Sequence, residues 1–116
     1  MFKSEETGTY YLMYSGAGAD TSHYSIGVAT SKGPAGPFVK SGENPVVSPQ
    51  DSSSVGVYGP GHHAVWEDKV GGRRWAFYHR KGGAEAGWDR ALCVDEVVVV
   101  EERGGGAGTV SIAVTP

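Results

Sequence analysis

The chain has 116 residues, and its 19 Gly and 6 Pro are together about twice as frequent as the ~12% average. Helix interiors do not tolerate that density, since each Gly costs ~1 kcal/mol and each Pro ~3 kcal/mol relative to Ala, so an all-helical fold is excluded. The net charge is −3, no basic cluster exceeds Arg73-Arg74 and no apolar run approaches the ~18 residues of a membrane helix, so neither nucleic acid nor a membrane is expected as a partner. What remains is an all-β chain of short strands and tight turns.

Strands are predicted where β-branched and aromatic residues lie between turn residues. The first half of the chain contains three such segments: Thr9–Ser15, Tyr24–Thr30 and a short one around Phe38. A fourth strand is either absent here or begins at Met1-Phe2-Lys3.

Residues 41–61 are rich in Pro, Ser and Gly and are predicted to form a connection, either an ordered loop or a poorly structured one. Four strands follow: His62–Glu67, Arg74–His79, Ala91–Val100 and Thr109–Val114. The continuous apolar run Val97–Val100 predicts burial on both faces of the third of these.

A meander of four antiparallel strands is the unit blade of a β-propeller. The pattern therefore predicts a single partial propeller domain over residues 1–116, with an incomplete blade at 1–40, the connection at 41–61 and a blade at 62–116. Isolated meanders expose sheet faces and unpaired edges, so we expect the chain to be part of a larger ring.

The segment Gly59-Pro60-Gly61-His62-His63 carries the strongest chemical signal. Its glycines and proline turn the backbone sharply before a strand, and only one of two adjacent histidines can face a given cleft. A histidine in that position serves as a metal ligand, a substrate hydrogen-bonding group or a charge-tuning group. The alternative is a histidine that is satisfied at the surface or in the core.

Two further groups stand at strand ends, Tyr78-His79-Arg80 and Asp89-Arg90. The fixed donor fork of Arg90 suits a hydroxylated or anionic ligand, although for Arg90 taken alone a surface ion pair with Asp89, Asp95 or Glu96 is the more common role. Glycosidase chemistry needs two carboxylates across a cleft, and no pair among the 13 acidic residues has an obvious claim to that role.

Several segments, in this order and over nearly the whole chain, together resemble glycoside hydrolase family 43. They are Gly8–Gly16 (GTYYLMYSG), Tyr24–Ser31 (YSIGVATS), Gly36–Lys40 (GPFVK), Asn44–Val47 (NPVV), Gly59–Val65 (GPGHHAV), Phe77–His79 (FYH) and Arg90–Val97 (RALCVDEV).

The resemblance implies a five-bladed β-propeller that hydrolyses O-glycosyl bonds in arabinose- or xylose-containing polysaccharides with inversion. The family uses an Asp base, a second Asp that tunes pKa values and a Glu acid in a Glu-Gly-Pro or Glu-Ala-Pro motif. Neither Glu5 nor Glu6 is followed by such a pair. No catalytic residue is therefore assigned here, the three acids are expected before residue 1, and the chain alone is expected to be inactive. The alternative is a non-catalytic carbohydrate-binding or structural propeller remnant.

The resemblance also implies roles for four residues at the rim of the site. His62 would point into the central channel, near a structural ion such as calcium or a cluster of water molecules. Arg90 would reach the substrate near the cleaved bond, with His79 and Tyr58 as further substrate-binding residues. The implied partner is a pentose-containing oligo- or polysaccharide, and no cofactor is required.

Overall fold

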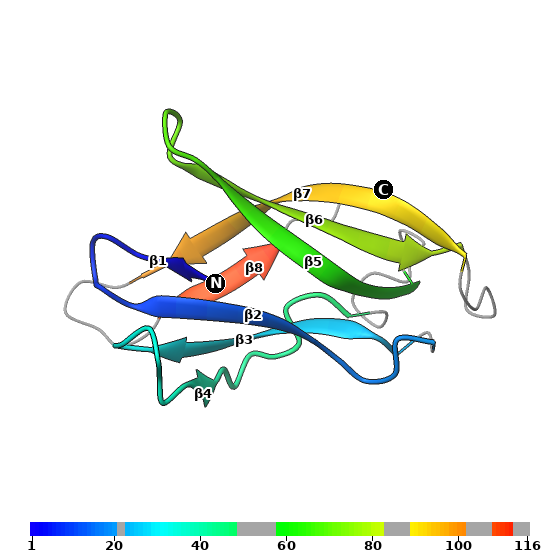
Figure 1. Cartoon of the computed structure of the whole chain (residues 1–116), viewed down its shortest axis with the longest axis horizontal. Helices are drawn as coiled ribbons and strands as arrows, with labels where there is room; N and C mark the ends of the chain where they lie inside the picture. Colours follow the sequence, from blue (N-terminus) through cyan, green and yellow to red (C-terminus); the bar gives the residue numbers. More distant parts are fainter. Residues whose placement is uncertain (21–22, 49–57, 83–88, 102–107, 113–116) are drawn as a thin grey trace.

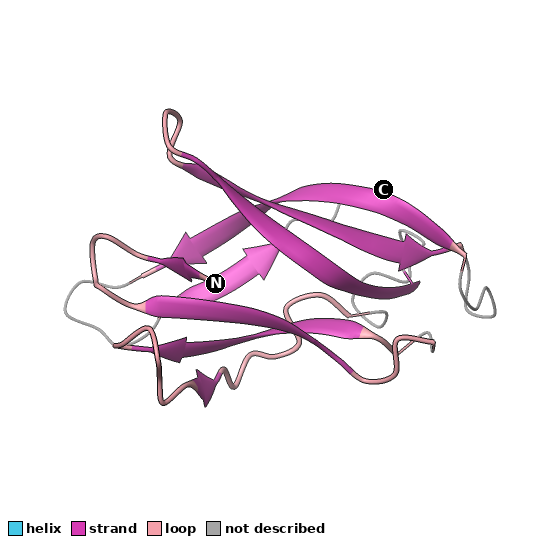
Figure 2. Ribbon diagram, in the orientation of Figure 1, coloured by secondary structure: helices cyan, strands magenta, loops and turns pink. Residues whose placement is uncertain are grey.

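The computed structural model describes residues 1–20, 23–48, 58–82, 89–101 and 108–112, and all regular structure within them is β-strand (Figures 1 and 2). The strands are β1 (Phe2–Lys3), β2 (Tyr10–Gly16), β3 (Ser25–Ser31), β4 (Val39–Lys40), β5 (Tyr58–Asp68), β6 (Arg73–Lys81), β7 (Arg90–Val100) and β8 (Thr109–Ile112). They form two four-stranded antiparallel sheets, ordered β1-β2-β3-β4 and β5-β6-β7-β8. The predicted all-β fold of two four-stranded meanders is confirmed. The described residues contain no helix that could span a membrane.

The first sheet is built on the pairing of β2 with β3, which runs from Tyr10 opposite Ser31 to Gly16 opposite Ser25. Alternation along β2 buries Tyr11 and Met13, as expected for a strand with one face in the core. The first strand, left open by the sequence, is the two-residue β1, in which Phe2 lies opposite Tyr11 and stacks on its ring.

A single asparagine orders the chain that follows β4. The Oδ1 atom of Asn44 accepts a hydrogen bond from the Val28 N–H at 2.8 Å, and its Nδ2 atom donates to the Val28 carbonyl at 2.9 Å. The same Nδ2 atom donates to the Tyr14 hydroxyl at 3.0 Å. The amide thus acts as a strand partner for β3, and the predicted connection is ordered over residues 41–48. Its residues 49–57 lie outside the described residues.

Strand β5 begins at Tyr58, four residues earlier than predicted. Tyr58 pairs with Lys81 and Gly61 with His79, and the register shifts on both sides of Gly61. A glycine- and proline-rich segment reads as a turn in the sequence, yet here it continues the strand through these irregularities. Strand β8 is described as far as Ile112, so its predicted end at Val114 lies outside the described residues.

The two sheets pack face to face, with β5 lying against β2 and β3 (Figure 1). The first sheet and the chain after it supply one half of the core, and the second sheet supplies the other. The buried residues of the core are Phe2, Tyr11, Met13, Ile26, Val28 and Val47 from the first sheet and the chain after it, and Ala76, Tyr78, Val97, Val110 and Ile112 from the second sheet.

The predicted burial of Val97–Val100 on both faces is wrong. Val97 is 4% exposed, whereas Val98 is 39% and Val100 61% exposed, because successive side chains leave a strand on opposite faces. At this end of β7, the described part of the first sheet covers the face that carries Val97 and not the face that carries Val98 and Val100. The opposite face of the second sheet exposes a set of hydrophobic side chains, namely Trp66, Phe77, Leu92, Val94, Val98 and Val100.

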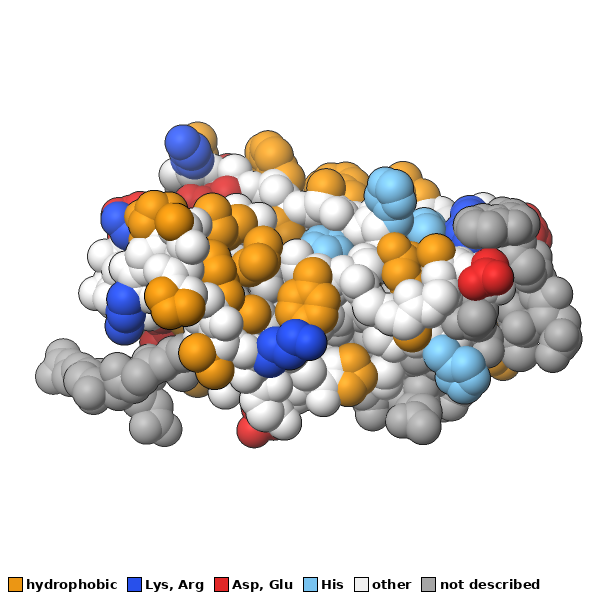
Figure 3. Space-filling model, turned by 60° about the horizontal axis from the view of Figure 1, so that its bottom comes forward, with side chains coloured by type: hydrophobic (Ala, Val, Ile, Leu, Met, Phe, Trp, Pro, Cys, Tyr) orange, Lys and Arg blue, Asp and Glu red, His pale blue; other side chains and the backbone are white. Residues whose placement is uncertain are grey.

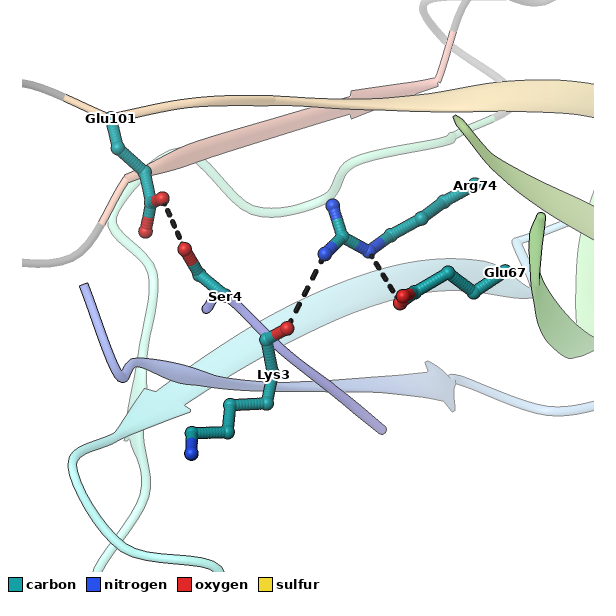
Figure 4. A network of polar contacts seen from close by, with 5 residues as sticks. All are labelled: Lys3, Ser4, Glu67, Arg74 and Glu101. Atoms are coloured by element: carbon teal, nitrogen blue, oxygen red, sulfur yellow. Dashed lines mark hydrogen bonds and ion pairs between the residues drawn. The ribbon is translucent and has the colours of Figure 1, made fainter. Parts of the chain in front are cut away.

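Glu101, directly after β7, joins the second sheet to the first. Its carboxylate accepts hydrogen bonds from the hydroxyls of Ser4 at 2.5 Å, Thr7 at 2.7 Å and Tyr11 at 2.6 Å. Figure 4 shows the bond to Ser4 beside a second link, in which Arg74 donates to the carbonyl of Lys3. Polar contacts therefore support the hydrophobic packing between the sheets.

Candidate functional site

The start of β5 contains two residues with a left-handed backbone conformation. Gly59 has φ 52° and His62 has φ 50°, both in the left-handed region. Glycine adopts this conformation freely, but for His62 it costs ~1–2 kcal/mol. The His62 N–H donates to the Ser15 hydroxyl at 2.9 Å, which fixes the segment to β2. Strain held in place by neighbouring contacts is typical of functional positions.

The two adjacent histidines occupy different environments, as the alternation predicts. His62 is exposed, whereas His63 is half-buried and its Nδ1 atom is buried without a hydrogen-bond partner among the described residues. Burial lowers the pKa of His63, and a hydrogen bond to the Met13 backbone partly offsets the effect. Figure 3 shows histidine side chains at the surface on one face of the molecule. Of the pair, His62 is the one available to a ligand.

Tyr58, Lys81 and Arg90 lie opposite one another on three adjacent strands. Residues paired in this way leave a sheet on the same face. The Arg90 guanidinium donates to the carbonyls of Ala19 at 2.9 Å and Asp89 at 3.2 Å. Arg90 therefore holds the chain after β2 as well as standing in the candidate site.

His79 lies near two rings, that of the histidine at the start of β5 and that of Tyr24, which immediately precedes β3. Its ring centroid is 6.2 Å from that of His62 and 5.9 Å from that of Tyr24. Its Nε2 atom is buried and has no hydrogen-bond partner in the described part of the chain. Burial lowers the pKa of His79, as do the positive charges of Arg90 and other nearby basic groups.

The structure thus brings all four predicted site residues, Tyr58, His62, His79 and Arg90, to one end of the second sheet. It adds Lys81, whose residue is completely buried and whose pKa is lowered, first by burial and then by Arg90. A lysine at the end of a strand is usually solvated, so no sequence pattern indicated a site role for it.

The other addition is Tyr24, which lies immediately before β3 and meets His79 through the tertiary fold. Asp20 lies in the chain after β2. Its negative charge raises the pKa of Lys81 and partly offsets the effect of burial, so Asp20 lies near the Lys81 ammonium group. The site therefore has contributions from both sheets.

Four of the described carboxylates are engaged in structural contacts. Asp95 is buried and accepts a hydrogen bond from the Tyr78 hydroxyl at 2.6 Å. Glu96 pairs with Arg73 and Glu67 with Arg74. Glu101 accepts the three hydroxyl hydrogen bonds described above.

His62 was also predicted to be a metal ligand. Among the described residues there is no group of three His, Cys, Asp or Glu side chains that could hold a metal ion. Calcium in addition prefers oxygen ligands to imidazole nitrogen. The described residues do not by themselves complete such a site, and the metal role of His62 stays a prediction.

Residues 3–102 match the family model described as glycosyl hydrolases family 43. The chain belongs to glycoside hydrolase family 43. The predicted resemblance is confirmed, and the two sheets are blades of the β-propeller of this family. No match was found among curated proteins.

Solved structures of glycosidases align with nearly the whole chain. An endo-1,4-beta-xylanase from Bacteroides thetaiotaomicron VPI-5482 is 28% identical, with TM-score 0.79, over 97% of this chain and 36% of that one. A thermostable family-43 glycoside hydrolase is 30% identical, with TM-score 0.76, over 98% of this chain and 34% of that one. An endo-1,5-alpha-L-arabinanase from Thermotoga petrophila RKU-1 is 26% identical, with TM-score 0.69, over 99% of this chain and 30% of that one. The chain spans about a third of the length of these structures.

Proposed function

We propose that this chain is part of a glycosidase that hydrolyses O-glycosyl bonds in arabinose- or xylose-containing polysaccharides with inversion. The observation that carries the proposal is the gathering of Tyr58, His62, His79 and Arg90 at one end of the second sheet. Family membership and the xylanase and arabinanase among the similar structures support the substrate class.

The proposed task of these residues is to bind and orient a sugar. Arg90 offers guanidinium donors in a fixed plane, and Tyr58 offers a hydroxyl that donates and accepts. Because the pKa of His79 is lowered from 6.5, its imidazole is neutral at pH 7 and offers one donor and one acceptor. Sugar hydroxyls both donate and accept hydrogen bonds, so neutral groups that do the same are suitable partners for them.

Inverting hydrolysis needs a general acid and a general base, which activates the attacking water. The Glu-Gly-Pro or Glu-Ala-Pro motif that carries the acid in this family does not occur in the sequence, so we assign the catalytic acids to other parts of the complete enzyme. This chain would then supply substrate contacts at the rim of the site. No step is routed through a metal ion, and a structural cation or water cluster beside His62 is a separate proposal.

The absence of this motif also favours a second candidate function, carbohydrate binding without hydrolysis. The two candidates differ in the fate of the sugar, so one pair of assays addresses both. The 116-residue chain is incubated with aryl arabinofuranosides and xylosides, and its binding of arabino- and xylo-oligosaccharides is measured by calorimetry.

We expect binding without turnover, and we expect Arg90→Ala and His62→Ala to weaken binding. The matched control is Arg73→Ala, which removes an exposed arginine that pairs with Glu96 away from the site. Turnover by the purified chain would refute the assignment of the catalytic acids to other parts of the enzyme. Absence of binding, or an equal loss in Arg73→Ala, would refute the role of the four residues.

A further inference from the structure

Tyr24, immediately before β3, packs on the backbone of the second sheet at the point where β5 is irregular. A Cβ atom added at Gly61 would overlap the Tyr24 ring, so the ring lies directly on this glycine. Gly61 pairs with His79 across the sheet, and the Tyr24 and His79 ring centroids are 5.9 Å apart with an interplanar angle of 31°. The Tyr24 side chain therefore contacts both members of this pair.

The His79 imidazole therefore has two neighbouring rings, that of Tyr24 before β3 and that of His62 on β5. Its Nε2 atom has no hydrogen-bond partner within the described residues. At the Nε2 end of the imidazole, the contacts among the described residues are therefore ring contacts and not a hydrogen bond. The absence of a side chain at Gly61 gives Tyr24 the room to do so.

We infer that Tyr24 is a positioning residue of the candidate site, whose ring rests on Gly61 and holds the His79 imidazole beside His62. The inference rests on the proposed function in so far as His79 is one of the residues proposed to bind the sugar. The packing itself is independent of any ligand and is testable in the free chain.

Proton NMR of the histidine side chains measures this role directly. Tyr24→Leu is compared with Tyr24→Phe, which keeps the ring, and with Tyr10→Leu, which makes the same change at a half-buried tyrosine of β2 that packs against Lys3. The charges that act on His79 from Arg90, His62 and Lys81 are present in all three variants.

We expect Tyr24→Leu to move the His79 imidazole resonances and to raise its titration midpoint toward 6.5, because lost packing admits water. We expect Tyr24→Phe to preserve both values. Unchanged His79 resonances and midpoint in Tyr24→Leu would overturn the inference, and so would an equal change in Tyr10→Leu.

A second variant approaches the same contact from the other side. Gly61→Ala retains the tyrosine but displaces its ring, and we expect the His79 resonances to move in this variant too. Gly16→Ala is the control, since a Cβ atom there meets nothing within 4 Å. Equal His79 spectra in the two glycine variants would contradict the packing described here.

Titration with arabino- and xylo-oligosaccharides separates this inference from the proposed function. If wild type binds, we expect Tyr24→Leu to bind about fivefold more weakly, the equivalent of one lost hydrogen bond. Unchanged affinity would overturn the positioning role. If no variant binds, the proposed function fails, while the His79 spectra still decide whether Tyr24 positions the imidazole.

Discussion

Replacing Glu101 with Gln tests the polar junction between the two sheets, because the amide keeps the shape of the side chain and removes its charge. The carboxylate accepts hydrogen bonds from three hydroxyls at 2.5–2.7 Å, and all three donors belong to the segment that contains β1 and the start of β2. The Tyr11 hydroxyl also accepts a hydrogen bond from the Gly108 N–H at 3.0 Å. The Glu101 side chain thus connects the segment after β7 to the N-terminal segment of the chain.

The size of the effect follows from the charge on the acceptor. A hydrogen bond to a charged group contributes ~1.5–3 kcal/mol, but the three bonds share one half-buried carboxylate and are not additive. Gln retains one oxygen that can accept, so we expect a loss of about 2 kcal/mol in the free energy of unfolding. For a domain of this size that corresponds to a fall of about 8 °C in Tm.

Urea-induced unfolding at pH 7, followed by tryptophan fluorescence, measures the loss. Glu96→Gln is the matched control, since it makes the same change on β7 at a half-buried carboxylate that pairs with the exposed Arg73. We expect the control to leave the unfolding midpoint close to that of wild type. Coinciding midpoints for Glu101→Gln and Glu96→Gln would refute the reasoning.

The pH dependence of the Tm of wild type and of Glu101→Gln gives an independent check. Burial raises the pKa of Glu101, but hydrogen bonds from Ser4, Tyr11 and Thr7 outweigh it and hold the pKa below 4.5. Since the folded-state pKa is depressed, the stabilisation is present above pH 4.5 and is lost as the pH falls through the folded-state value. The difference in Tm between wild type and Glu101→Gln should therefore shrink in acid, and a constant difference would contradict the assignment.

Three further predictions concern the core. Burial and the hydrogen bond to Glu101 raise the pKa of Tyr11 to about 12, so absorbance titration should show a tyrosine that ionises near 12 and disappears in Tyr11→Phe, with stability lost between pH 10 and 12. Tyr78→Phe leaves the buried Asp95 carboxylate without that donor and should cost about 2 kcal/mol in urea unfolding; an unchanged midpoint would count against the bond. Val97→Thr should cost ~1–3 kcal/mol, whereas Val98→Thr should stay within about 0.5 kcal/mol, and equal costs would contradict the alternation of the two side chains.

Local sequence patterns predicted most of the fold. Alternating and β-branched runs placed β2, β3, β6 and β7 to within two residues of their ends, because these strands have turn residues on both sides. The start of β5 was predicted too late, since Gly and Pro signal a turn whether or not the strand continues through a bulge. The apolar run at the end of β7 was misread because composition does not say which faces a neighbouring sheet covers.

The candidate site was predictable only where a residue type carries chemistry at a strand end. His62, His79 and Arg90 met that condition, and the structure gathers them. Lys81 and Tyr24 did not meet it, because their place depends on cross-strand register and on packing between the sheets. The same holds for the hydrogen bond from Arg90 to the Ala19 carbonyl, which joins positions 71 residues apart.

Chemical-shift mapping of the ¹⁵N-labelled chain with arabino- and xylo-oligosaccharides tests the proposed carbohydrate site most directly. We predict that shifts concentrate at the end of the second sheet formed by Tyr58, His62, His79 and Arg90, and that they diminish in Arg90→Ala. An unchanged spectrum, or shifts confined to the exposed hydrophobic face around Val98 and Val100, would contradict the account.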